Sequence, residues 1–221
     1  MKKGKSIYVA AIVFGLVFLL SAPAMASFTP IYQPDASYTG STINLMAGLA
    51  GTDGFTTYSS LSGTGMVVTF NNPLTLQTAP ITGSWATWAL PPYTESGTPR
   101  VLEIPGGGTG GTTLTMTLSA PTTTFGFELE PFTYAVYSTT VEFYNGAALV
   151  GSIIQAVDGY YGARLFAAQA DPFTSVVVHC DDTGGFAIAQ LRYNAVPIPG
   201  ALWLFGPGLV GLAAVKRRFK K

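Results

Sequence analysis

The chain has 221 residues, with eleven basic and eleven acidic side chains, a formal net charge of zero, one histidine and one cysteine. The lone cysteine, Cys180, excludes an intrachain disulfide and a metal site built from several cysteines. One histidine and one cysteine leave a serine or cysteine triad few members. The composition therefore disfavours a triad hydrolase, and we expect no enzyme activity.

The basic residues are concentrated at the two ends of the chain. Three lysines precede residue 6 and five basic residues follow residue 215, whereas only Arg100, Arg164 and Arg192 lie between them. All eleven acidic residues lie in this middle part, so three positive against eleven negative charges leave it at −8. Binding to a phosphate backbone requires clustered Lys and Arg. Nucleic acid is therefore not expected as a partner.

Residues 1–26 follow the pattern of a secretory signal peptide. The basic start Lys2-Lys3-Gly4-Lys5 precedes an apolar stretch from Ile7 to Leu20 and the small-residue site Ala24-Met25-Ala26. This order predicts a signal helix that signal peptidase removes after Ala26, and hence export. The alternative is an uncleaved anchor, which the short apolar run disfavours.

Residues 27–195 are expected to form one all-β domain. Short runs rich in Val, Ile, Thr, Phe and Tyr alternate in polarity and are separated by Gly, Pro, Asn and Asp, which is typical of strands. Asn145-Gly146 predicts a hairpin, and Gly106–Gly111 a loose connection. This spacing predicts an antiparallel β-sandwich of the jelly-roll kind. Strands are expected over residues 66–70, 113–118, 125–130, 140–144, 148–154, 175–180 and 186–193.

Residues 196–221 combine a proline motif, an apolar run and a basic tail. Sixteen uncharged residues from Gly200 to Val215, as a helix, would rise about 24 Å, slightly less than the ~30 Å hydrocarbon core. We expect a single transmembrane helix whose basic end stays cytoplasmic. The motif is Val196, Pro197, Ile198 and Pro199, and the basic tail is Lys216, Arg217, Arg218, Lys220 and Lys221.

These last 26 residues resemble the PEP-CTERM sorting signal of Gram-negative bacteria. Pro197 and Pro199 match the two prolines of its Pro-x-Pro motif, and Ile198 stands between them as in the variant that continues Ala-Leu-Trp-Leu-Phe-Gly. The resemblance implies transient anchoring in the inner membrane, cleavage by an exosortase, and a final place on the cell surface or in the extracellular biofilm matrix. The alternative is an unprocessed anchor. The middle domain is similar, more loosely, to the β-sandwich domains that such proteins carry without an assigned reaction.

Trp85, Trp88 and Tyr93 lie within nine residues of one another. Exposed aromatic rings would stack on the sugars of an exopolysaccharide, whereas core packing is the usual fate of tryptophan. Because Trp85 and Trp88 are three apart, they cannot both face inward on a regular strand, so at least one is expected to be exposed. A carbohydrate-binding surface is one interpretation and a packed core is the other.

Glu128 and Glu130 lie two apart on the predicted strand 125–130. They share a face at about 7 Å spacing, which suits the acid and base of a glycoside hydrolase. Catalytic pairs normally come from different strands, however. We therefore expect both carboxylates on a solvated outer face next to Pro131, opposite an inward-facing set formed by Phe125, Phe127 and Leu129.

Asp181 and Asp182 precede Thr183-Gly184-Gly185 and offer oxygen ligands for calcium. Aspartate is also favoured in turns for conformational reasons, and no EF-hand spacing is present. Calcium is thus an alternative, and no other cofactor is expected. His179 and Cys180 are adjacent on a predicted strand and should point to opposite faces, with Cys180 in the core.

Taken together, these patterns predict an exported structural or binding protein of the cell surface or extracellular matrix. A carbohydrate-binding module is the alternative, and a secreted glycoside hydrolase is the third interpretation.

Overall fold

A computed structural model describes residues 27–80, 85–107 and 109–194 of the chain. These residues form antiparallel strands and one short helix, which confirms the predicted all-β class. The elements are β1 (Phe28–Ile31), α2 (Ala36–Ser41), β2 (Ile43–Asn44), β3 (Thr57–Gly63), β4 (Met66–Thr78), β5 (Arg100–Pro105), β6 (Thr112–Pro131), β7 (Val136–Asn145), β8 (Ala148–Asp158), β9 (Arg164–Cys180) and β10 (Gly185–Tyr193).

The predicted signal peptide, residues 1–26, and the predicted sorting signal, residues 196–221, lie outside the described residues. Across the stretches that are described, no helix has the length and apolarity to cross a membrane.

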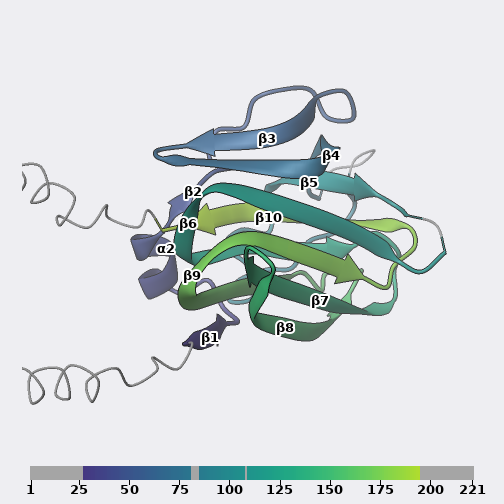
Figure 1. The fold of residues 1–221 in the computed structure, drawn as a ribbon. Helices are drawn as coiled ribbons and strands as arrows, with labels where there is room; N and C mark the ends of the chain where they lie inside the picture. The colour runs from purple at the N-terminus through teal and green to yellow at the C-terminus, as the bar shows by residue number, and fades with distance from the viewer. Residues whose placement is uncertain (1–26, 81–84, 108, 195–221) are drawn as a thin grey trace, which may run out of the picture.

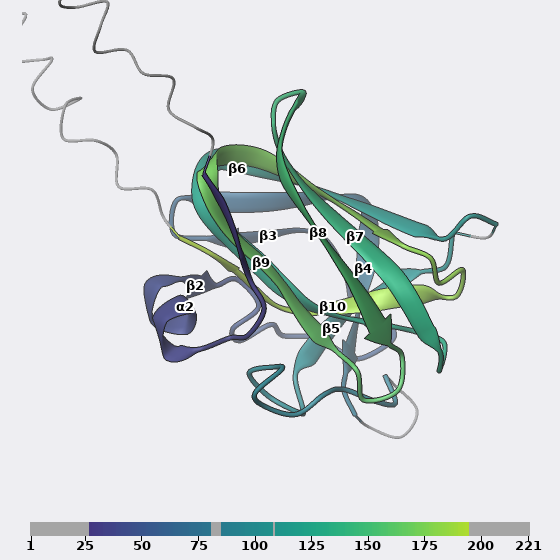
Figure 2. The same ribbon diagram turned by 90° about the horizontal axis from the view of Figure 1, so that it is seen from below.

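The two longest strands, β6 and β9, lie side by side and connect two layers of the sheet (Figures 1 and 2). The first half of β6 pairs with β4, and its second half pairs with β10. The predicted strands 113–118 and 125–130 are therefore two halves of one strand, with register shifts between Thr117 and Thr124. One layer contains β3, β7, β8 and most of β4, and the other contains β2, β10, β5 and β1. The end of β4, residues 75–78, pairs with β5 and so also joins the two layers.

A large hydrophobic core contains side chains from both layers. The alternation predicted from the sequence is confirmed, because the expected inward residues are buried in one cluster: Met66, Val68, Phe70, Leu114, Met116, Leu118, Phe125, Phe127 and Leu129. Cys180 belongs to the same cluster, while the adjacent His179 exposes 46% of its side chain. The predicted hairpin is also present, with Asn145 paired to Ala148 and Gly146 at φ +60°.

The outer face of the second layer is buried as well. Residues 85–98, here called the covering segment, have no regular secondary structure and pack across this face. The strands below present small side chains, which let the segment approach closely. The resulting second cluster contains Ala79, Trp85, Trp88, Ala89, Val101, Ala163, Ala187 and Ala189.

Gln190 interrupts the alternation of β10. Its φ is +50°, and the register with β6 shifts between Ala189 and Arg192. One extra residue in a strand reverses the faces of all that follow. Leu191 and Tyr193 therefore enter the main core, and Arg192 points to the outer face.

Gly126 lies where Tyr38 of α2 packs against the sheet. A β-carbon added there would overlap Ala167 and would lie 2.7 Å from the hydroxyl of Tyr38, a buried residue of α2. We predict that Gly126→Ala lowers the free energy of unfolding by about 1–3 kcal/mol, the usual cost of overpacking. Gly40→Ala, with no atom near its added β-carbon, is the control. Equal urea midpoints for the two variants would contradict this packing.

Candidate functional site

Glu128 and Glu130 do share the outer face of β6, but the prediction that this face is solvated is wrong. Both residues are completely buried. The covering segment, some forty residues earlier in the chain, lies over them and excludes water. A buried carboxylate requires hydrogen-bond donors, and the covering segment provides them.

Glu128 accepts hydrogen bonds from the Trp88 indole at 3.0 Å and from the backbone N–H of Glu95 at 2.5 Å. The Glu95 carboxylate, in turn, accepts two hydrogen bonds from Arg192, at 2.6 and 2.7 Å. Arg192 also donates to the carbonyl oxygens of Thr39 and Thr42 at the end of α2. This network joins the covering segment, β6, β10 and α2.

Glu130 links the covering segment to the loop between β8 and β9. It accepts hydrogen bonds from the Thr87 hydroxyl and from the backbone N–H of Ala163, the latter at 3.0 Å. Thr87 also lies 3.3 Å from the carbonyl oxygen of Gly159. Burial raises the pKa of both Glu128 and Glu130 to about 7, because the charged carboxylate loses its hydration.

Trp85 and Trp88 are both buried, with 4% and 1% of their surfaces exposed. The expectation that at least one is exposed is therefore wrong, since alternation applies to regular strands and the covering segment is irregular. Tyr93, the third member of the predicted set, exposes 46% of its surface. An exposed platform of these three residues does not form.

Tyr93 belongs instead to another group of aromatic residues, which is exposed at the end of the sheet where β6 stops. We call it the aromatic face. Tyr134 and Tyr160 have ring centroids 5.3 Å apart, and Tyr160 and Tyr161 have centroids 4.8 Å apart. Every member exposes between 46% and 58% of its surface, and the members are Tyr93, Phe132, Tyr134, Tyr160 and Tyr161.

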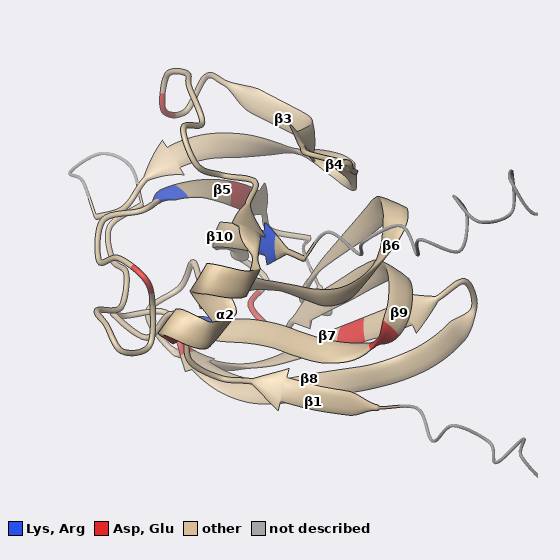
Figure 3. Ribbon diagram, turned by 90° about the vertical axis from the view of Figure 1, so that its left-hand side faces the viewer, with Lys and Arg blue, Asp and Glu red and all other residues tan. Residues whose placement is uncertain are grey.

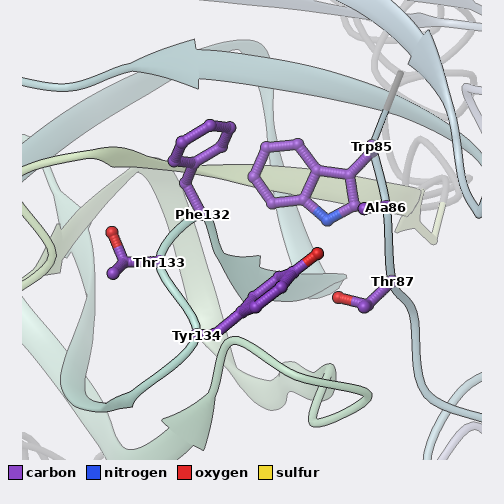
Figure 4. Close-up of a pocket in the computed structure, with 6 residues that line it drawn as sticks. All are labelled: Trp85, Ala86, Thr87, Phe132, Thr133 and Tyr134. Carbon is purple, nitrogen blue, oxygen red and sulfur yellow. The ribbon is translucent and has the colours of Figure 1, made fainter. Parts of the chain in front are cut away.

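A cavity of about 460 Å³ opens beside the aromatic face. Figure 4 shows Phe132, Trp85 and Tyr134 around it, with the Tyr134 ring turned toward Thr87. Trp85 packs its edge against Phe132 at 5.5 Å between centroids, so this buried tryptophan still forms a wall of the cavity. The lining is mainly apolar with hydroxyl groups at its margin, a composition typical of small-molecule sites.

The loops that carry the aromatic face hold each other in place. The backbone N–H of Gly159 donates to Ala135 at 2.9 Å, and the N–H of Tyr160 donates to the Asp158 carboxylate at 3.0 Å. Tyr161 has φ +54°, a conformation that costs a non-glycine residue about 1–2 kcal/mol. Its ring is half exposed, so core packing does not account for this strain. A strained residue at a solvent-facing position points to a functional constraint.

Asp182 and Asp181 have different environments. The buried Asp182 carboxylate accepts hydrogen bonds from the N–H and hydroxyl of Thr133 and from the N–H of Gly184, all at 2.7–2.9 Å. Asp181 is exposed and lies 3.4 Å from His179. Among residues 27–80, 85–107 and 109–194, no three His, Cys, Asp or Glu side chains are grouped to hold a metal ion. These contacts favour the turn interpretation over the calcium alternative.

No protein-family model matches the sequence, and no curated protein matches it. Among solved structures, the chain is similar to the family 11 carbohydrate-binding module of a cellulosomal cellulase of Clostridium thermocellum, with 9% identity, 70% of this chain and 94% of that one covered, and a TM-score of 0.33. It is also similar to the enzymatically active domain of tailspike protein 4 of bacteriophage CBA120, with 17% identity, 59% of this chain covered and a TM-score of 0.29. It spans only 19% of that tailspike chain. Likenesses at these scores carry no functional argument.

The raised pKa values predict a pH dependence of stability. In the unfolded chain each glutamate titrates near its ordinary value of 4.5, so between about pH 4.5 and 7 the folded state retains protons that the unfolded state has lost. The two protonated glutamates therefore stabilise the folded state fully below pH 4.5, and this stabilisation disappears as the pH rises through 7. We predict that the free energy of unfolding falls less for Glu130→Gln than for the parent between pH 5 and 8. The difference in slope should reach about 1.4 kcal/mol per pH unit between pH 5 and 7 and vanish above that.

Urea denaturation across this pH range measures the effect. Glu103→Gln, a partly exposed glutamate on β5, is the matched control. A Glu130→Gln slope identical to that of the parent would contradict burial of a titrating carboxylate.

Proposed function

We propose that this chain is an exported carbohydrate-binding protein that uses the aromatic face to bind polysaccharide of the cell surface or extracellular matrix. The observation that carries the proposal is the set of five half-exposed aromatic rings held on interlocked loops beside a cavity. Contiguous exposed apolar surface on a soluble domain usually marks a binding site. Tyrosine suits sugars because its ring packs against the C–H groups of a sugar ring while its hydroxyl forms hydrogen bonds with the sugar hydroxyls.

The aromatic face lies at the end of the domain opposite its two chain termini, which supports a binding site directed away from a membrane anchor. The domain begins and ends at one end of the sheet, where Phe28 pairs with Ala170 and the N–H of Asn194 donates to Thr124. The aromatic face follows Pro131, seven residues further along β6. Seven strand residues span about 23 Å. A membrane anchor after Asn194 would therefore leave the aromatic face directed outward.

Binding without hydrolysis is part of the proposal. Glu128 and Glu130 are the paired carboxylates of the sequence, and both are enclosed beneath the covering segment. Their oxygens accept hydrogen bonds from that segment and from the N–H of Ala163. We also propose that the fold is a jelly-roll-like sandwich, because β6 and β9 each take part in both layers. Sorting by an exosortase rests on the resemblance of residues 196–221.

A glycan array probed with the full chain in detergent tests the binding site. We predict that Tyr134→Ala and Tyr161→Gly each weaken binding to the best glycan about tenfold or more, about 1.4 kcal/mol, because each removes a central ring. Tyr161→Gly should fold well, since glycine accepts a positive φ. Tyr32→Ala is the matched control, because Tyr32 is 52% exposed like Tyr161 but makes none of the ring contacts of the aromatic face. Unchanged binding by both face variants would contradict the assignment.

Mass spectrometry of the protein from its native host tests sorting. If residues 196–221 are a processed signal, exported material should lack the residues beyond about Pro199 and begin at Ser27. A Pro197→Ala, Pro199→Ala double variant should accumulate with Lys221 intact, because it lacks the motif. Exported wild-type protein that retains Lys221 would refute processing.

A further inference from the structure

Arg164 differs from the other cationic side chains of the described residues. Arg100 pairs with Asp53 at 3.2 Å, Arg192 pairs with Glu95, and His179 lies near Asp181. Arg164 has no carboxylate within ion-pair distance among residues 27–80, 85–107 and 109–194, although all eleven acidic residues of the chain lie in these ranges. The sparse and separated charges of the domain are visible in Figure 3.

The guanidinium of Arg164 is nevertheless fixed in position. Its Nη1 donates to the carbonyl oxygens of Gly162 and Ala163, both at 2.9 Å. Its central carbon lies 4.3 Å from the centroid of the Tyr93 ring, which stabilises the cation from one side. Within the part of the chain that the structure describes, Nε and Nη2 have no hydrogen-bond partner. These two nitrogens form the edge of a guanidinium that binds a carboxylate through two parallel hydrogen bonds.

A second cavity, of about 290 Å³, lies next to this guanidinium. Tyr93, Tyr161 and Arg164 line it together with the apolar residues Ala89, Leu90 and Pro91. Its size is near the lower end of small-molecule sites. It therefore offers two aromatic rings and one oriented cation to a single small unit, within reach of the Tyr160 and Tyr134 rings of the aromatic face.

We propose that this cavity is a subsite for a sugar that carries a carboxylate, a uronic acid, with Arg164 as its specificity-determining residue. The inference rests on the proposed carbohydrate binding and names the class of sugar. A domain of net charge −8 repels an acidic glycan at long range, so recognition requires a local, oriented cation. Arg164 provides it.

Isothermal titration calorimetry with the full chain in detergent tests the subsite, using oligogalacturonate and its fully methyl-esterified form as probes. The two ligands differ in the charge of the carboxyl group. We expect the parent protein to bind the acid about tenfold more tightly than the ester, with the difference shrinking at high salt. Arg164→Gln should remove this preference and weaken binding to the ester far less than binding to the acid. Arg164→Lys should retain only part of the preference, because lysine cannot form two parallel hydrogen bonds with one carboxylate.

Arg100→Gln is the matched control and should keep the full preference, because Arg100 pairs with Asp53 away from the cavity. Binding to the ester also reports that each variant is folded. A parent protein that binds acid and ester equally, or an Arg164→Gln variant that keeps the preference, would overturn the subsite while leaving the proposed function standing. Absence of binding to every glycan would overturn both.

Discussion

Two carboxylates buried on the outer face of β6 impose the constraint on which this end of the molecule depends. Glu128 and Glu130 have no contact with solvent, and an unsatisfied polar group in that position would cost several kcal/mol. Apart from the N–H of Ala163, their hydrogen-bond donors come from an irregular segment that has no strand pairing of its own to hold it. The carboxylates therefore fix the covering segment, and the Arg192–Glu95 pair extends the same network to α2.

The aromatic face follows from this arrangement. The covering segment brings Trp85 against Phe132 and Tyr93 against Arg164, and Thr87 reaches from Glu130 to the loop that carries Tyr160 and Tyr161. Rings that are distant in sequence are thereby held on loops with little freedom. Preorganised rings bind with a smaller entropic loss than mobile ones. The strained backbone of Tyr161 fits the same account, because the fold tolerates a conformational cost to keep an exposed ring in place.

Local alternation predicted all or part of β4, β6, β7, β8, β9 and β10 and the main core, and Asn145-Gly146 predicted the hairpin, because both depend on residues close in sequence. It did not predict β1, β2, β3 or β5. The register of that hairpin, which pairs Val136 with Asp158, could also have placed the Tyr134 and Tyr160 loops side by side. The face reversal at Gln190 and the burial of Glu128 could not be predicted, since they depend on a bulge and on a segment forty residues away. The small residues Ala187, Ala189 and Gly126 were the available signal that a further layer covers this face.

A crystal structure of the protein with a bound oligosaccharide tests the central claim most directly. The account predicts sugar rings packed against Tyr134, Tyr160 and Tyr161, with little movement of the covering segment between the free and the bound protein. Sugar bound instead at the opposite end of the sheet, near Asn194 and Thr124, would contradict it.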